Sequence, residues 1–179
     1  MNLMNNAVIN TPFPINEPVL DYAPGSPEKK AVKAALAEAA ATQLDIPLVI
    51  GGRRIETGRL GQCVMPHDHG HVLANYHKAG PAEVLMAIDA AVAAQAEWQG
   101  FRWEERASIF LKAADLLATK YRATMNAASM LNGGKTIYQA EIDAACELID
   151  FLRFNVRYAQ EIYEKQPESS TGVWNYVQH

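Results

Sequence analysis

Three long stretches of the chain repeat apolar residues at the 3.6-residue spacing of an α-helix. The first starts at Pro81, the second runs from about Glu104 to Leu131, and the third runs from Thr136 to about Lys165. The faces expected to be buried are Leu85, Ile88, Val92, Gln95 and Trp98 in the first; Ala107, Phe110, Ala114, Leu117, Tyr121, Met125 and Ala128 in the second; and Ile137, Ala144, Leu148, Phe151, Leu152, Asn155 and Ala159 in the third. The pattern predicts three amphipathic helices.

Capping residues predict where helices begin and end. Ser26-Pro27-Glu28 combines an N-cap residue, a proline at the first helical position and an acidic first turn, so a further helix is expected up to about Thr42. Residues 132–134, Asn-Gly-Gly, are expected to end the second long helix, because glycine adopts the left-handed cap at little cost. The run 133–136, Gly-Gly-Lys-Thr, also resembles the end of a phosphate-binding loop, but a helix precedes it, so the cap is preferred.

Alternating positions and turn residues predict a small β portion. Residues 46–50 and 53–56 flank Gly51-Gly52 as a hairpin, and residues 62–65 and 72–78 flank a turn over residues 66–70. Residues 171–178 alternate again, as a strand that begins and is cut off, so we expect the chain to be a truncated part of something longer. The Asn- and Pro-rich residues 1–25 are expected to form an extended arm. The chain alone is thus predicted to be mostly α with short β elements.

Composition narrows the function classes. The 179 residues carry a net charge of −4, which gives no electrostatic reason to expect nucleic acid or an anionic membrane as partner. No apolar run approaches the roughly 20 residues that span a bilayer. The N-terminal stretch has neither arginine nor an apolar signal core, and two cysteines are too few for a disulfide framework, so a cytoplasmic protein is expected.

Two groups of reactive side chains are interpreted as structural. Cys146 lies in a predicted helix beside Glu147, with further carboxylates nearby, and negative neighbours and burial raise a thiol pKa, which disfavours a nucleophile. Cys63, in a predicted strand, is interpreted in the same way. The histidines of the 67–71 segment (His67, His69 and His71) would converge on one side of a strand as metal ligands. The flanking proline and glycine indicate a turn and no fourth ligand is evident, so no metal site is predicted.

The order of short motifs along the chain resembles the N-terminal part of the aldehyde dehydrogenase superfamily. These motifs are Ile88-Asp89-Ala90-Ala91, Trp98, Glu105-Arg106-Ala107, Ala113-Ala114-Asp115-Leu116-Leu117, Gly134-Lys135-Thr136 and Ala140-Glu141. The segments NEPVL (16–20), GSPE (25–28), HGH (69–71), FLKAADLL (110–117) and GKTIYQAEIDAACELIDFLRFN (134–155) are similar to a narrower group, the stand-alone Δ1-pyrroline-5-carboxylate (glutamate-γ-semialdehyde) dehydrogenases.

The resemblance implies an α/β aldehyde dehydrogenase fold in the full-length parent. Residues 26–167 would be the helical and strand part of its cofactor-binding domain, and residues 171–179 the start of an oligomerisation strand. It also implies NAD as cofactor, a homodimer or higher homo-oligomer, and oxidation of L-glutamate γ-semialdehyde to L-glutamate in proline degradation. The family's catalytic cysteine, general base and pyrophosphate-contacting segments lie C-terminal to this chain. No catalytic or cofactor-binding residue is therefore predicted here, and the chain alone should be inactive.

Glu147 is the predicted substrate-binding residue. The resemblance implies that a glutamate in this Cys-Glu-Leu-Ile-Asp context points into the aldehyde tunnel, near the amino-acid end of the substrate. A carboxylate suits that position because the semialdehyde carries an ammonium group, and a partly desolvated ion pair selects it over plain aldehydes. The alternative is a solvated helix face, which is the interpretation given to Asp143 and Asp150.

Two other functions stay open from the sequence. A non-catalytic helical interaction module derived from this family would expose the tunnel face of the third helix and would be oligomeric or adhesive. An aldehyde dehydrogenase of different specificity would lack activity on the semialdehyde.

Overall fold

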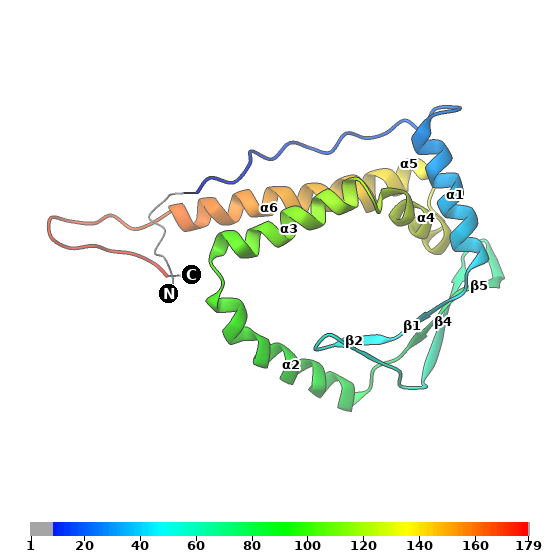
Figure 1. The fold of residues 1–179 in the computed structure, drawn as a ribbon, viewed down its shortest axis with the longest axis horizontal. Coiled ribbons are helices and arrows are strands. Elements are labelled where there is room, and N and C mark those ends of the chain that lie inside the picture. Colours follow the sequence, from blue (N-terminus) through cyan, green and yellow to red (C-terminus); the bar gives the residue numbers. More distant parts are fainter. Residues whose placement is uncertain (1–8, 179) are drawn as a thin grey trace.

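The computed structural model describes residues 9–178 as an extended arm, a group of packed helices and two small sheets, with one helix standing apart (Figure 1). The elements are α1 (Pro27–Ala41), β1 (Leu44–Ile46), β2 (Leu48–Ile50), β3 (Arg53–Ile55), β4 (Leu60–Met65), β5 (Asp68–His77), α2 (Pro81–Gly100), α3 (Trp103–Ala118), α4 (Arg122–Gly133), α5 (Ile137–Ala140), the π-helical segment η1 (Glu141–Cys146) and α6 (Glu147–Glu164). The mainly helical content with short strands agrees with the sequence prediction.

The arm is extended, as predicted, over residues 9–25, and it runs alongside α6 (Figure 1). Its far end is held by Gln160, whose Oε1 accepts hydrogen bonds from the backbone nitrogen and the hydroxyl of Thr11, both at 2.7 Å. Residues 1–8 of the predicted arm lie outside the described residues.

The helix caps predicted from the sequence are present in the structure. The Ser26 hydroxyl accepts a hydrogen bond from the Lys29 amide at 3.3 Å and starts α1. Gly134 follows α4 with φ +64°. This is the left-handed conformation, which glycine adopts with less strain than other residues. Thr136 and Gln139 form the predicted capping box ahead of α5. These local side-chain bonds explain why the boundaries of the helices could be placed from the sequence.

The β portion consists of a hairpin and a three-stranded sheet. β2 and β3 pair around Gly51 and Gly52, both with positive φ, which confirms the predicted hairpin. In the other sheet β5 lies between β4, its antiparallel neighbour, and β1, which runs parallel to it and was not predicted. The turn between β4 and β5 is shorter than predicted, because Met65 already pairs with Asp68 and the strand begins there. His69, Gly70 and His71 are therefore strand residues.

The second long helix was predicted to be continuous. This prediction is wrong, because the segment is divided into α3 and α4. At the break the Thr119 hydroxyl donates to the Asp115 carbonyl at 2.7 Å, and the Tyr121 amide donates to the Leu116 carbonyl at 2.9 Å, five residues back. The Thr119 hydroxyl adds a second bond to a carbonyl that the Thr119 amide already contacts at 3.1 Å, and the Tyr121 bond departs from the regular four-residue spacing. The break redirects the chain so that α4 packs against α1 as well as η1.

The third predicted helix is continuous, but the prediction of its buried face is wrong. Leu148 and Phe151, expected inside, are 39% and 62% exposed, whereas Ile149, Val156 and Gln160 are buried. The cause is η1, in which a backbone N–H bonds a carbonyl five rather than four residues back, as Glu147 does with Ile142. The wider turn rotates everything that follows relative to a uniform 3.6-residue period.

The core lies where α3, η1 and α6 meet. Ala114, Ala145 and Ile149 are almost fully buried there, with Leu117, Ala118 and Leu152 packed around them. Small residues at two of the three central positions let the helices approach closely. No helix within residues 9–178 combines the length and apolarity that a bilayer crossing requires.

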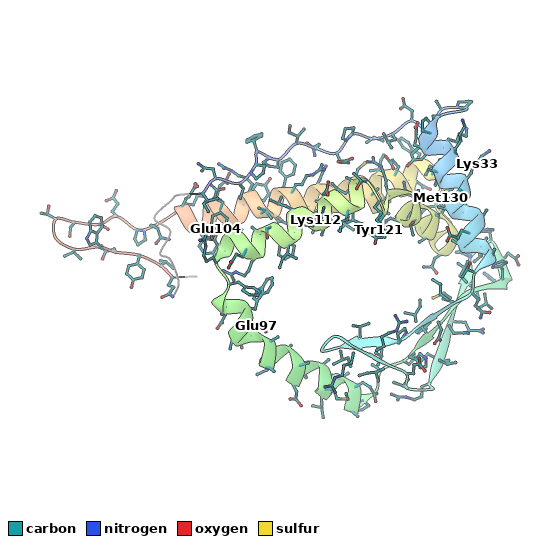
Figure 2. The ribbon with its side chains drawn as sticks, viewed as in Figure 1. Lys33, Glu97, Glu104, Lys112, Tyr121 and Met130 are labelled. Atoms are coloured by element: carbon teal, nitrogen blue, oxygen red, sulfur yellow. The ribbon has the colours of Figure 1, made fainter. Side chains whose placement is uncertain are left out.

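Helix α2 is amphipathic by sequence but buries no residue completely. Its apolar residues Val84, Leu85, Ile88 and Val92 are between 50% and 64% exposed. Most of the helix stands apart from the α3–α6 bundle, and its side chains extend freely around it, with Glu97 near its C-terminal end (Figure 2). The predicted apolar face therefore exists in the sequence but has no cover within the described residues.

Residues 171–178 do not form the predicted strand. The described segment contains one isolated bridge between Ser170 and Val173 around a turn at Gly172. Trp174 and Tyr176 on one predicted face are 87% and 74% exposed, and Val173 and Val177 on the other are 52% and 49% exposed, so neither face is fully covered. A strand needs a partner for its backbone groups, and none of the described strands lies beside this segment. His179 lies outside the described residues.

Candidate functional site

Glu147 is the first residue of α6 and its side chain is exposed. At about 100° per residue, it points roughly 160° away from the buried Ile149 on the helix surface. Phe151 lies one turn further along the same exposed face. The Glu147 side chain makes no hydrogen bond or ion pair with any described residue. The structure thus presents a carboxylate outward on a rigid helix, and its role in substrate binding stays a prediction.

A buried polar cluster lies beside η1, the segment that leads into α6. It joins the arm to α4 and η1, and it comprises Glu17, Tyr22, Arg122, Asn126 and Glu141, called here the arm-docking cluster. The side chains of Arg122 and Glu141 are 9% and 0% exposed. A fully buried glutamate is stable only if its charge and its lone pairs are matched.

Glu141 has such partners on each of its two carboxylate oxygens. One accepts from the Leu20 amide at 2.9 Å and from Nη2 of Arg122. The other accepts from the Tyr22 hydroxyl at 2.7 Å, from Nδ2 of Asn126 at 2.8 Å and from Nε of Arg122 at 3.3 Å. The bidentate guanidinium and the two arm donors compensate for the loss of water. The arm is therefore part of the site that keeps this charge buried.

The charge states of the cluster follow from these contacts. Burial alone would raise the pKa of Glu141, but hydrogen bonds from Arg122, Leu20 and Tyr22 outweigh it and hold the pKa below its usual range. Burial alone would lower the pKa of Arg122, and its carboxylate partners reverse this and raise it. Burial, followed by the hydrogen bond to Glu141, raises the pKa of Tyr22 to about 12. At neutral pH the cluster holds an ionised glutamate and arginine beside a neutral phenol.

Glu17 extends the cluster from the arm to α6. Its carboxylate pairs with Nη1 of Arg122 and, at 2.6 Å, with Nη1 of Arg153. Its backbone amide donates to Asp150 at 2.7 Å, and so does the Asn16 side chain. The interpretation of Asp150 as a solvated residue is therefore wrong, because it receives two hydrogen bonds from the arm. Asp143, by contrast, is exposed and paired with Lys135 at 2.7 Å.

Cys146 is buried at the edge of the arm-docking cluster. Its Sγ lies 3.5 Å from Nη2 of Arg122 and 3.8 Å from both the Pro18 carbonyl and the Glu141 carboxylate. Burial, followed by the charge of Glu141, raises the pKa of the thiol to about 11. This direction confirms the sequence prediction. A protonated, enclosed thiol contributes packing and no nucleophile.

The three histidines of the 67–71 segment are distributed over the turn and β5. His71 Nε2 lies 2.8 Å from the Ala40 carbonyl oxygen, so this ring nitrogen already has a protein partner. Among the described residues no group of three or more His, Cys, Asp or Glu side chains is arranged to hold a metal ion.

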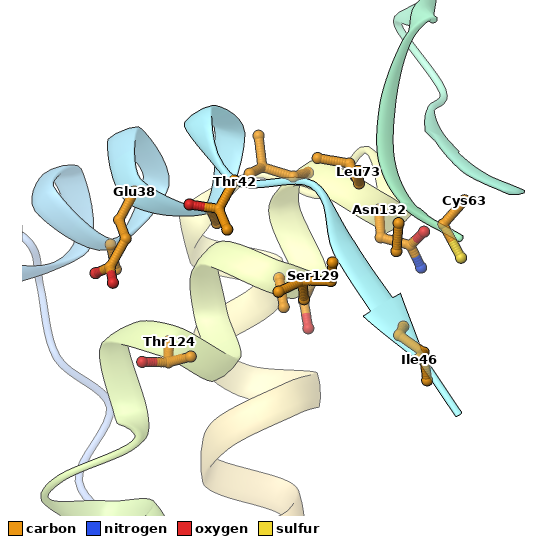
Figure 3. Close-up of a pocket in the computed structure, with 14 residues that line it drawn as sticks. Glu38, Thr42, Ile46, Cys63, Leu73, Thr124, Ser129 and Asn132 are labelled. Atoms are coloured by element: carbon orange, nitrogen blue, oxygen red, sulfur yellow. The ribbon is translucent and has the colours of Figure 1, made fainter. Parts of the chain in front are cut away.

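An apolar hollow lies between α1, β1, β5 and α4 (Figure 3). It has a volume of about 520 Å³, and its wall combines apolar groups, among them Ile46 and Leu73, with the half-buried Cys63 of β4. Polar groups at its margin come from Glu38, Thr124, Ser129 and Asn132. The wall contains no basic side chain that would meet a phosphate.

The described residues do not form a cradle for a dinucleotide. The Gly-Gly-Lys-Thr run connects the C-terminus of α4 to the N-cap of the four-residue helix α5, and an added Cβ on Gly134 would lie 3.6 Å from the Pro66 side chain. Gly134 therefore packs against protein and does not open a space for a pyrophosphate. No step of nicotinamide chemistry is assigned to residues of this chain.

The arrangement of an arm, long helices and a small sheet has counterparts among known proteins. The sequence model described as "Aldehyde dehydrogenase family" matches residues 55–179, more than half of the chain. The chain belongs to the aldehyde dehydrogenase family. The crystal structure of the Δ-pyrroline-5-carboxylate dehydrogenase from Mycobacterium tuberculosis bound with NAD is 46% identical and superposes with a TM-score of 0.94, over 96% of this chain and 32% of that one.

Other relatives of this aldehyde dehydrogenase carry the same description. The mitochondrial Delta-1-pyrroline-5-carboxylate dehydrogenase of Dictyostelium discoideum is 48% identical over 167 residues, 93% of this chain. The Homo sapiens protein of the same name is 46% identical over 86% of this chain. The chain spans about 30% of the length of the curated relatives it matches.

Sequence reasoning missed the arm-docking cluster of this chain. Glu141 was noted within a short motif, but nothing in its spacing distinguished it from the exposed Asp143. Arg122 follows a helix break that the periodicity did not show. The available signal was the arm itself, since a segment without apolar periodicity needs polar partners to stay in place.

Proposed function

We propose that this chain is the N-terminal part of an NAD-dependent dehydrogenase that oxidises L-glutamate γ-semialdehyde, the open form of Δ1-pyrroline-5-carboxylate, to L-glutamate in proline degradation. The observation that carries the proposal is the 44–48% identity to proteins named for this activity, over 86–97% of the chain. The TM-score of 0.94 to a structure described as bound with NAD supports NAD as the cofactor.

Within such an enzyme this chain would supply structure and substrate selection rather than bond-making. We propose that the nucleophilic cysteine, the general base and most of the NAD-binding residues are contributed by the remainder of the enzyme. The raised pKa of Cys146 supports this division, because the buried thiol is not a competing nucleophile. The exposed apolar face of α2 supports it as well, since the remainder of the enzyme would cover it.

We propose Glu147 as the residue that selects the amino-acid end of the substrate. Its support is an exposed carboxylate on a rigid helix that has no partner among the described residues. The ammonium group of glutamate semialdehyde would form an ion pair with it once the tunnel excludes water, and a plain aldehyde would not.

A homodimer or higher homo-oligomer, with residues 171–179 contributing a pairing strand, completes the proposal. Residues 171–178 are exposed and belong to none of the described strands, which suits a segment that finds its strand partner elsewhere. We also propose a cytoplasmic location, although the Dictyostelium discoideum and Homo sapiens relatives are named mitochondrial.

Steady-state assays with the purified complete gene product test this function. NADH formation is followed by its absorbance, with glutamate γ-semialdehyde and with a panel of unsubstituted aldehydes. We expect the highest kcat/KM for the semialdehyde and no turnover by the isolated 179-residue chain, which is the matched control. A preference for an aldehyde without the amino-acid group would redirect the proposal to a different substrate.

A further inference from the structure

The arm is attached on both sides of Glu147 along the helix. Upstream, the Leu20 amide is bonded to Glu141, six residues before Glu147. Downstream, the Glu17 amide is bonded to Asp150, three residues after it. The helical segment that carries Glu147 is therefore fixed at both ends by one short stretch of the arm.

The same contacts fix the rotation of this segment about the helix axis. Glu141 and Cys146 are five residues apart and both face Arg122, which only the widened turn of η1 allows. A regular α-helical turn would move one of the two side chains away from the guanidinium. The Arg122 contacts thus favour the π-helical geometry, and this geometry sets the direction in which α6 starts.

We propose that residues 17–22 of the arm, together with Arg122, form a positioning device for the carboxylate of Glu147. This inference rests on the proposed function, in which that carboxylate meets the ammonium group of an amino-acid semialdehyde. Glu147 has no side-chain partner among the described residues, so its direction depends on the helix alone. An arm that loosens lets the first turn of α6 return to a regular period and turns the carboxylate away from the substrate.

Glu17 is the residue through which the device is best probed. Among the described arm residues, Glu17 is the one whose side chain links the arm to both Arg122 and Arg153, and that side chain is 10% exposed. Glu17→Gln keeps the shape and one acceptor oxygen but removes the charge that both arginines face. Glu161→Gln is the matched control, because it removes a partly exposed ion pair with Arg157 on the same helix, outside the contacts made by residues 17–22.

The readout is the ratio of kcat/KM for glutamate γ-semialdehyde to that for butanal, measured on the complete enzyme with NAD. In Glu17→Gln we expect the ratio to fall by roughly tenfold, mainly through KM for the semialdehyde. Butanal carries no ammonium group, so its kcat/KM should stay within about twofold of the wild type. Glu161→Gln should leave both values unchanged. An equal loss with both substrates would overturn the proposal, since that is the signature of a merely structural role.

A double-mutant cycle with Glu147→Gln tests whether Glu17 acts through Glu147. If Glu17 acts through Glu147, adding Glu17→Gln to Glu147→Gln should lower semialdehyde turnover no further. Additive losses would contradict the positioning role. If Glu17→Gln yields too little folded enzyme, Asp150→Asn weakens the downstream attachment and should give the same ratio change; an unchanged ratio overturns the proposal. Wild-type enzyme that does not oxidise the semialdehyde would instead refute the proposed function itself.

Discussion

Replacing Arg122 with alanine in the complete gene product should release the N-terminal arm and cost about 3–5 kcal/mol of local stability. The guanidinium is the cation that faces the fully buried Glu141, and its loss leaves that carboxylate with hydrogen bonds but without a compensating charge. It also frees Glu17 and the Pro18 carbonyl, which Arg122 bonds at 2.7 Å. A buried charge without its partner is among the costliest changes a folded chain can carry.

Native-state hydrogen exchange measures this effect at a single amide. The Leu20 N–H donates to Glu141, so its protection reports directly on docking of the arm. Arg122→Ala should accelerate its exchange strongly, whereas the Thr11 amide, bonded to Gln160, should change less. Lys112→Ala, which removes an exposed pair with Asp115, is the control and should leave both amides unaffected. Unchanged protection of Leu20 in Arg122→Ala would contradict the role assigned to the arm-docking cluster.

Replacing Glu147 with alanine should lower kcat/KM for glutamate γ-semialdehyde on the order of 10- to 100-fold, the usual consequence of leaving one member of a desolvated ion pair alone. Protein stability should change little, because the Glu147 side chain is exposed and has no partner among the described residues. Steady-state kinetics with the semialdehyde and with butanal, together with a thermal unfolding curve, measure both effects.

The matched control for this change is Asp143→Ala. Asp143 lies one turn upstream, is exposed, and loses only a surface pair with Lys135. It should retain the kinetics of the wild type with both substrates. Semialdehyde kinetics unchanged in Glu147→Ala would remove Glu147 from the substrate site, and an equal loss with butanal would assign it a role other than recognition of the ammonium group.

The parts of this structure that were predictable are those fixed by local chemistry. Ser26 and Thr136 cap helices through bonds within four residues, and Gly134 supplies a left-handed conformation that other residues avoid. The glycines of the β2–β3 hairpin act in the same way. Each of these signals depends on neighbours in the sequence, so the chain pattern alone was sufficient.

The missed features depend on contacts between distant segments. The helix break before Arg122 and the widened turn of η1 satisfy Glu141, whose partners lie more than 100 residues away in the arm as well as 19 residues away in α4. A uniform helical period cannot anticipate such a turn, and for that reason Phe151 was placed inside although it is exposed. Strand β1 was missed because its parallel partner, β5, is remote in sequence.

The residues of the candidate site also differ in whether the sequence alone could reveal them. Glu147 was reached through a family resemblance, and the structure adds that it is exposed and rigidly carried. The arm-docking cluster could not be derived from periodicity, because Glu17, Arg122 and Glu141 are isolated charged residues in three separate segments. Buried charges are recognisable only when the chain is folded, since their stability depends on partners that the sequence does not list side by side.

The intact mass of the native gene product tests the central claim most directly. The 179 residues have a mass of 19.7 kDa and span about 30% of the relatives' length. A mass about three times as large is expected if these residues are the N-terminal part of a semialdehyde dehydrogenase. A native product whose mass equals that of the chain alone would contradict this account, because the arm-docking cluster and Glu147 would then belong to a protein without the dehydrogenase's catalytic part.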